Sequence, residues 1–462
     1  MSTIPFPVIR TALALALLPA GLVVLRAADD SDAEIKALRE QIRLLDQRLH
    51  QLEQTQQLKE QEAAAAAKAA PKIAISDKGF TFASGDGANS VRIGGLVQLD
   101  SRLFFGDGGG VYNNSFVLRR ARLISEGTIG RIYSFQLVSE FGGTNAPSVL
   151  DANLGVAPSK AVQFKIGKFK APVGLELIQS DSATFFAERS LVTNLVPNRD
   201  LGVQVGGSFA DGAFTYAAGV FNGVADGAST TNIDFDNDKD VVARVFAQPF
   251  KNAKDSTWQG LSLGVAASLG REKGAAAVTA GYKTDGQQTF FKYNSTVVAD
   301  GRVWRVSPQA YYYRGPFGAL GEYVVSTVNA RPVATGAKTT LQNRAWQLAA
   351  GFVLTGEDAS FTSVTPRQPF SWDDGTWGAW QIVARYANLK LDDNVFPFFA
   401  SPATNAGEAT SAGIGLNWFL SKTVRTSLDY FHTRFSNPVP VSSTQILRQD
   451  EQALITRFQL SF

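Results

Sequence analysis

The residues best suited to chemistry are basic side chains at alternate positions of strand-like segments. Arg120 and Arg122 are separated by Ala121 and followed by Leu123. Alternate residues of a strand share a face, so both guanidinium groups point the same way and repel unless an anion or carboxylate lies between them. A guanidinium group binds phosphate or carboxylate oxygens with a planar fork and stays charged at any relevant pH. The pair therefore predicts an anion-binding face, and Arg119 is expected on the opposite face.

The same alternation assigns further basic residues to this inward face. Rings of arginine or lysine are what an anion pore uses, and arginine is the more frequent of the two on this face. We expect the anion pathway at Arg120, Arg122, Lys165, Arg244, Arg305, Arg385 and Arg457. The alternative is that these cations pair with inward acidic residues and brace the wall, the candidates being Asp100, Glu126, Glu140, Asp151, Glu322 and Asp429.

A long segment between two strand-like stretches could narrow such a pore. Residues 170–199 carry charges of both signs, which would create a transverse field if the segment lay inside the pore. An ordinary exterior loop is the alternative. The expected constriction residues are Lys170, Glu176, Asp181, Glu188, Arg189 and Arg199.

The sequence offers little for catalysis or metal binding. Cys is absent, and of two histidines only His432 could serve a Ser-His hydrolase, which is the enzyme alternative. Aspartates at every second position of 234–240 resemble the start of a calcium loop, but the glycine and the bidentate glutamate of such a loop are missing. We expect no enzyme activity, no cofactor and no metal. The net charge of +3 is too small to predict a nucleic-acid partner.

Alternation with a period of two predicts the elements that position these residues. From residue 91 onward, apolar and polar residues alternate in sixteen short segments. Short links (Ala210 to Ala213, Arg314 to Gly318) take turns with long ones such as 170–199 and 222–239. A transmembrane barrel sorts short turns and long loops to opposite ends, whereas a soluble sandwich has no reason to do so. We therefore predict an all-β fold, an antiparallel transmembrane β-barrel of about 16 strands over residues 71–462, wide enough for an aqueous channel.

Two segments leave the strand count open. The stretch 355–377 should be a short turn by parity, yet it is over twenty residues long. It either folds as a plug or hides a strand pair. The stretch from Thr289 to Val298 could also form a strand, which would upset the parity.

The N-terminal part of the chain differs from the rest. Residues 1–28 have a basic start, a short apolar stretch and a small residue at the end, which predicts a cleaved signal peptide. Residues 29–70 lack Gly and are expected to form a coiled-coil stalk and a linker. A single amphipathic helix is the alternative. The heptad seam consists of Ile35, Leu38, Ile42, Leu45, Leu49 and Leu52.

The C-terminus ends on an alternating strand. Phe462, Leu460 and Phe458 occupy every second position. A terminal aromatic residue on such a strand resembles the signal that the outer-membrane barrel-assembly machinery reads.

Several stretches, taken in order, resemble the phosphate-selective porin O and P family over roughly 90–462. They include a basic Leu-Arg-Arg-Ala-Arg-Leu stretch, a Lys-Phe-Lys-Ala-Pro-Val-Gly stretch and an aromatic closing strand. Their positions are Leu118–Leu123, Ile166–Glu176, Glu188–Ser190, Leu354–Glu357, Trp377–Trp380, Arg385–Tyr386, Gly415–Trp418 and Thr456–Gln459.

The resemblance implies a sixteen-stranded homotrimeric porin in the bacterial outer membrane, among lipid and lipopolysaccharide. It also implies that the third long loop folds inward and that small anions pass, phosphate in the best-known members. An N-terminus that precedes an upward first strand places the stalk in the periplasm. The alternatives are a general non-selective porin and a structural anchor that uses the coiled coil.

Overall fold

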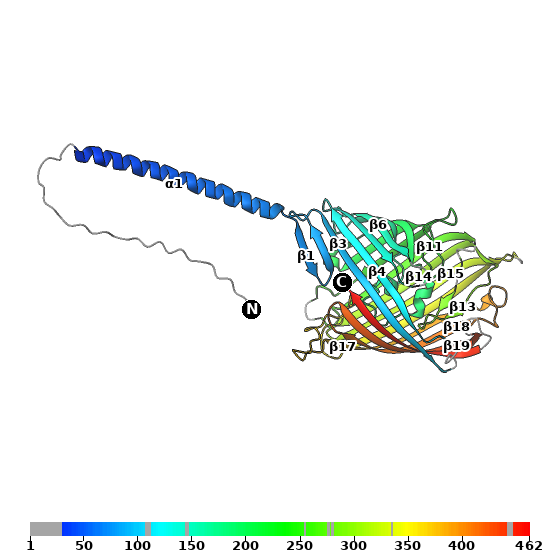
Figure 1. Ribbon diagram of the computed structural model, residues 1–462. Coiled ribbons are helices and arrows are strands. Elements are labelled where there is room, and N and C mark those ends of the chain that lie inside the picture. The colour runs from blue at the N-terminus through cyan, green and yellow to red at the C-terminus, as the bar shows by residue number, and fades with distance from the viewer. Residues whose placement is uncertain are drawn as a thin grey trace. The chain divides into compact units, whose positions relative to one another are not determined.

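The computed structural model describes residues 30–106, 112–143, 147–253, 256–274, 278, 281–333, 336–440 and 447–462 (Figure 1). The chain divides between Ala69 and Ala70 into two compact units. The expected signal peptide lies outside the described residues.

The first unit contains the helix α1 (Asp30–Ala69). Its sequence has neither glycine nor proline, and Pro71 follows its end, where a proline disfavours further helix. The seam residues are exposed, from Ile35 at 47% to Leu52 at 70%. The helix is thus confirmed, while its self-association stays a prediction. None of the described helices has both the length and the hydropathy that crossing a membrane as a helix requires.

The second unit is a closed antiparallel barrel. Sixteen strands form its wall within the described residues, which confirms the predicted fold. They are β3 (Ser90–Phe105), β4 (Ser115–Ile129), β5 (Tyr133–Glu140), β6 (Ser148–Val156), β7 (Gln163–Lys170), β8 (Arg199–Phe209), β9 (Phe214–Phe221), β10 (Asp240–Ala247), β11 (Leu261–Gly274), β14 (Val297–Arg314), β15 (Phe317–Pro332), β16 (Thr339–Val353), β17 (Ala379–Lys390), β18 (Glu408–Phe419), β19 (Val424–Pro440) and β20 (Leu447–Ser461). The barrel closes where β20 pairs with β3, for example Leu454 opposite Leu103.

The outer face of the wall is apolar. Leu154, Ile166 and Val203 lie directly opposite one another on three neighbouring strands and are each more than half exposed. Rows of this kind suit contact with lipid, whereas the intervening residues point into the lumen.

A short hairpin that the sequence analysis did not predict precedes the barrel. β1 (Lys72–Ser76) pairs with β2 (Gly79–Ala83), and β2 pairs with the start of β3 just beyond the end of β20. Gly79 has a φ of 96°, and a Cβ there would lie 2.2 Å from the carbonyl oxygen of Ile93, so the close approach requires glycine. Phe80 packs edge-on against Phe462 at 6.4 Å.

Neither of the two segments that left the strand count open, 355–377 and the stretch beginning at Thr289, adds a further strand between the predicted strands of the wall. β16 pairs directly with β17, so 355–377 is a long connection; within it Phe361 stacks on Tyr311 at 4.9 Å. The stretch beginning at Thr289 forms β13 (Thr289–Phe291), which pairs with β12 (Tyr282–Lys283) in a separate two-stranded sheet. The strand parity is therefore as predicted.

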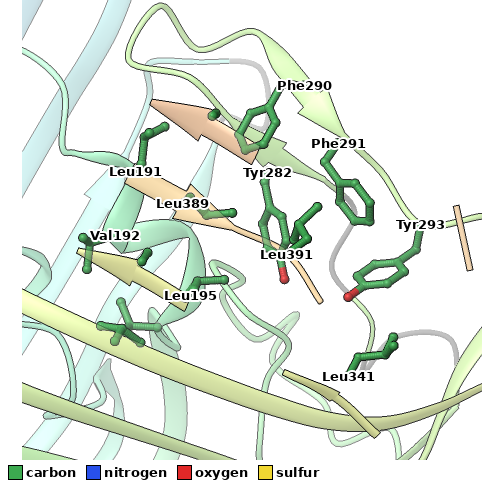
Figure 2. Packing of buried hydrophobic residues seen from close by; sticks show 14 of the residues in the cluster. Leu191, Val192, Leu195, Tyr282, Phe290, Phe291, Tyr293, Leu341, Leu389 and Leu391 are labelled. Atoms are coloured by element: carbon green, nitrogen blue, oxygen red, sulfur yellow. The ribbon is translucent and has the colours of Figure 1, made fainter. Parts of the chain in front are cut away.

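Loops fill part of the barrel interior. We call the connections at the long-loop end L3 (171–198), L4 (222–239), L5 (275–296) and L7 (391–407). L3 contains α2 (Leu175–Ile178) and η2 (Leu191–Leu195), and L7 contains η5 (Asp393–Val395). Figure 2 shows η2 packed with the aromatic residues of L5 and with Leu389 and Leu391, and this cluster is buried. The buried apolar core thus lies inside the barrel, where it joins L3, L5 and L7 to the wall.

Candidate functional site in the barrel lumen

L3 crosses the lumen and is bonded to strands on several sides of the barrel. Gln98 on β3 donates to the carbonyl of Asp181 at 3.0 Å, and Asn417 on β18 donates to that of Phe185 at 2.8 Å. The amide of Leu175 donates to Glu322 on β15 at 2.7 Å. These bonds hold L3 across the lumen.

Glu188 anchors one end of this loop to a group of arginines. Its carboxylate lies 2.8 Å from Arg102, 2.6 Å from Arg119 and 2.8 Å from Arg457. Asp100 binds Arg457 at 2.6 Å in the same cluster. Burial alone would raise the pKa of the Glu188 carboxyl, but the three guanidinium groups outweigh burial and hold that pKa well below its usual value.

The position of Arg119 corrects the expectation that it faces outward. Gln98 pairs with Arg120 while Leu99 pairs with Leu118, so the register shifts and Arg119 is the extra residue of a bulge. A bulge interrupts the alternation of faces, which brings the Arg119 guanidinium to Glu188 inside the barrel.

Asp181 occupies the space between the predicted arginine pair. It lies 3.2 Å from Arg120 and also binds Arg122 and Arg189. Arg122 binds Glu140 at 2.7 Å as well. Burial alone would raise the pKa of the Asp181 carboxyl, but the guanidinium groups around it hold that pKa well below its usual value. A carboxylate of the protein itself thus takes the place that we expected for a passing anion.

Arg385 links L3 to L5. It binds Glu176 of L3 at 3.3 Å and Asp285 of L5, and its guanidinium lies 4.5 Å from the ring centre of Phe186 and 5.2 Å from that of Phe431. Both acids and the arginine are almost completely buried. This contact fixes two loops at one point of the lumen.

A cavity lies in the lumen along the wall from β3 to β8, and we call it the vestibule. It has a volume of about 570 Å³ and reaches from L3 to the short-turn end of the barrel. Seven cationic side chains line it against three acidic side chains, Asp77, Asp151 and Asp181. The cations are Lys78, Arg92, Arg122, Lys165, Lys170, Arg199 and Lys422.

These cations differ in their partners. Lys422 binds Asp77 at 2.6 Å and Arg199 binds Asp151 at 3.1 Å, whereas the Lys170 ammonium donates to the carbonyls of L3 residues 177 and 179. Within the described part of the chain, Lys165 forms no ion pair, and its ammonium lies 5.2 Å from the ring centre of Phe169. Lys78, in the exposed β1–β2 turn, likewise forms no ion pair among the described residues, and Lys165 differs from it in standing on a strand of the wall, β7, beside Phe169.

The sequence matches the family described as phosphate-selective porin O and P over residues 91–462, which is most of the chain. The chain belongs to this family. The match confirms the resemblance predicted from the sequence and makes the protein an outer-membrane porin, a channel rather than an enzyme by its class.

Individual relatives of this porin are distant. Porin O of Pseudomonas aeruginosa is 24% identical over 394 residues, which cover 78% of this chain and 84% of that protein. Among solved structures, OmpT of Vibrio cholerae has a TM-score of 0.51 at 13% identity, covering 85% of this chain and 100% of that one. The outer-membrane channel DcaP of Acinetobacter baumannii has a TM-score of 0.51 at 12% identity, covering 82% and 98%. At these identities the two structures show the shared fold alone.

Two of the predicted pathway residues, Arg305 and Arg244, lie apart from the ion pairs of L3 and from the vestibule. Arg305 is buried and binds Asp226 of L4 at 2.7 Å. Arg244 donates to Gln309 at 3.1 Å and lies 4.4 Å from the ring centre of Phe246. In this porin the predicted cations therefore form several separate groups.

Several charged residues of the lumen were not predicted, among them Lys78, Lys422 and Asp285. Lys78 and Lys422 lie in turns, where alternation gives no signal, although their closeness to strand ends was visible. Asp285 lies in L5, which has no regular period, so its contact with Arg385 could not be predicted. At the C-terminus of the porin, Phe458 and Leu460 point outward from β20. Their role in assembly stays a prediction.

Proposed function

We propose that this porin passes small anions through the vestibule and past L3. The observation that carries the proposal is that seven vestibule cations face five acidic side chains when Glu126 and Glu140, the partners of Arg92 and Arg122, are counted, together with the ammonium of Lys165, which forms no ion pair among the described residues. A confined lumen of one sign of charge concentrates ions of the other sign and excludes ions of its own. The long loops face outside the cell, and the vestibule opens to the periplasm.

The arginines serve this function indirectly. Most of those predicted to bind anions are instead bonded to carboxylates of L3 or L5, as Arg457 is to Glu188. In this view they hold the constriction formed by Lys170, Glu176, Asp181, Glu188, Arg189 and Arg199, while the vestibule cations set the selectivity.

Changing Lys165 to glutamine is expected to lower the ratio of anion to cation permeability by about threefold, because one unpaired charge near the passing ion is lost. Reversal potentials of the porin in planar bilayers under a potassium chloride gradient measure this ratio. The matched control is Lys160→Gln, since Lys160 is exposed in the turn between β6 and β7. An equal ratio in the Lys165 variant and the wild type would reject the proposed role of Lys165, whereas a wild-type ratio near one would favour a general non-selective porin.

We further propose a homotrimer with α1 as a periplasmic stalk. The exposed apolar seam of α1 supports self-association. Cross-linking should yield trimers of the full chain, and a chain lacking residues 30–69 should conduct as the full chain does. Cross-linking that yields monomers alone would contradict the trimer. Loss of conductance in the chain without the stalk would contradict a dispensable stalk and would favour the structural-anchor alternative.

A further inference from the structure

The arginines that line the vestibule use their guanidinium N–H groups to bind carboxylates of the protein itself. Arg92 binds Glu126 through both Nε at 3.0 Å and Nη2 at 2.6 Å. Arg122 uses Nε for Glu140 at 2.7 Å and another nitrogen for Asp181. Selective binding of inorganic phosphate relies on several N–H groups that converge on its oxygens, and on guanidinium forks above all. The vestibule therefore offers inorganic phosphate few guanidinium groups that are not already bonded to a carboxylate.

A row of four lumen-facing residues crosses the same wall, and three of them are apolar while the fourth is Asp151, which binds Arg199. The register places Ile124 on β4 opposite Val138 on β5, and Val138 opposite Asp151 on β6. Phe169 on β7 follows Lys168, which pairs with Ala152, so Phe169 lies at the level of this row. Ile124, Val138 and Phe169 all line the vestibule.

The free ammonium reaches the row. Lys165 lies four residues before Phe169 on β7, and its side chain extends back to within 5.2 Å of that ring. One point charge therefore stands beside an apolar surface. Sites lined by apolar side chains with a few placed polar groups are typical of those that take small organic molecules.

We infer that the vestibule prefers organic anions, with a single carboxylate and an apolar body, over inorganic phosphate. The carboxylate lies at the Lys165 ammonium, and the apolar body packs on Phe169, Val138 and Ile124. This inference rests on the proposed anion-channel function and names the substrate class of the same site.

The test measures how added anions block the chloride current of the full-length porin in planar bilayers. Benzoate, acetate and inorganic phosphate are the probes, since benzoate and acetate share the carboxylate and differ in the apolar body. Benzoate should reach half-block at a concentration about tenfold below that of acetate, because the ring buries apolar area that acetate lacks, and also below that of phosphate.

Two variants separate the apolar row from the charge. Changing Ile124 and Val138 together to threonine should raise the half-blocking concentration of benzoate about threefold and leave that of acetate and phosphate alone. Threonine suits a strand and a lumen-facing position. Lys165→Gln should weaken block by all three anions.

The inference is overturned if phosphate blocks more strongly than benzoate, if acetate and benzoate block alike in the wild type, or if the threonine variant keeps the wild-type response to benzoate. The wild-type comparison decides by itself if the variant does not assemble. Any of these results in an anion-selective channel rejects this inference alone, whereas cation preference in potassium chloride rejects the proposed function.

Discussion

Replacing Glu188 by glutamine is expected to release L3 from the wall and to destabilise the barrel. The change removes the charge that Arg102, Arg119 and Arg457 share, and leaves Asp100 as the carboxylate of the cluster. Breaking a buried ion pair by removing one partner typically costs about 3–5 kcal/mol, because the remaining charge has no compensation. We expect a loss of that order in the free energy of unfolding, and a higher single-channel conductance because L3 no longer narrows the lumen.

Urea titration of the porin in lipid vesicles and single-channel recording test the two effects. The control is Asp393→Asn, since Asp393 is 91% exposed and lies 3.8 Å from Lys390, so its removal should change neither quantity. Wild-type stability and conductance in the Glu188 variant would show that the arginine cluster does not hold the constriction.

Replacing Arg385 by methionine is expected to have the second large effect. Methionine keeps most of the packing between Phe186 and Phe431 but leaves Glu176 and Asp285 without their guanidinium partner. Both carboxylates are at least 96% buried, so an unfolding free energy lower by about 3–5 kcal/mol is expected. Because Arg385 joins L3 to L5, the conductance should also fluctuate as both loops gain freedom.

The matched control for this variant is Arg331→Met. Arg331 also binds an aspartate, Asp300 at 2.9 Å, but both side chains are about a third exposed, at 34% and 31%. An exposed pair contributes little to stability, because water and salt screen both charges. If both variants lose the same stability, burial of the Arg385 pair is not what makes it important.

Alternation could predict the wall because the pleat of a strand fixes which residues point inward. Arg122, Lys165 and Arg457 were placed in the lumen for this reason, and the structure puts them there. Arg119 was misplaced because one extra residue in β4 shifts the register. The alternation of apolar and polar residues in one sequence does not reveal where a bulge occurs.

The partners of the inward residues could not be predicted. L3 and L5 have no repeating pattern, so nothing in the sequence pairs Asp181 with Arg120 or Asp285 with Arg385. The alternative that the arginines brace the structure was foreseen, but with acids of the wall, whereas many of the observed partners are in loops. The hairpin of β1 and β2 was missed although Asp77, Lys78 and Gly79 form a turn signal, because each strand has only five residues.

The reversal potential of the wild-type porin in a potassium chloride gradient tests the central claim most directly. If cations of the vestibule select the solute, the potential at zero current lies close to the equilibrium potential of chloride, and Lys165→Gln moves it toward zero. A wild-type potential at zero, or on the side of potassium, would contradict an anion channel.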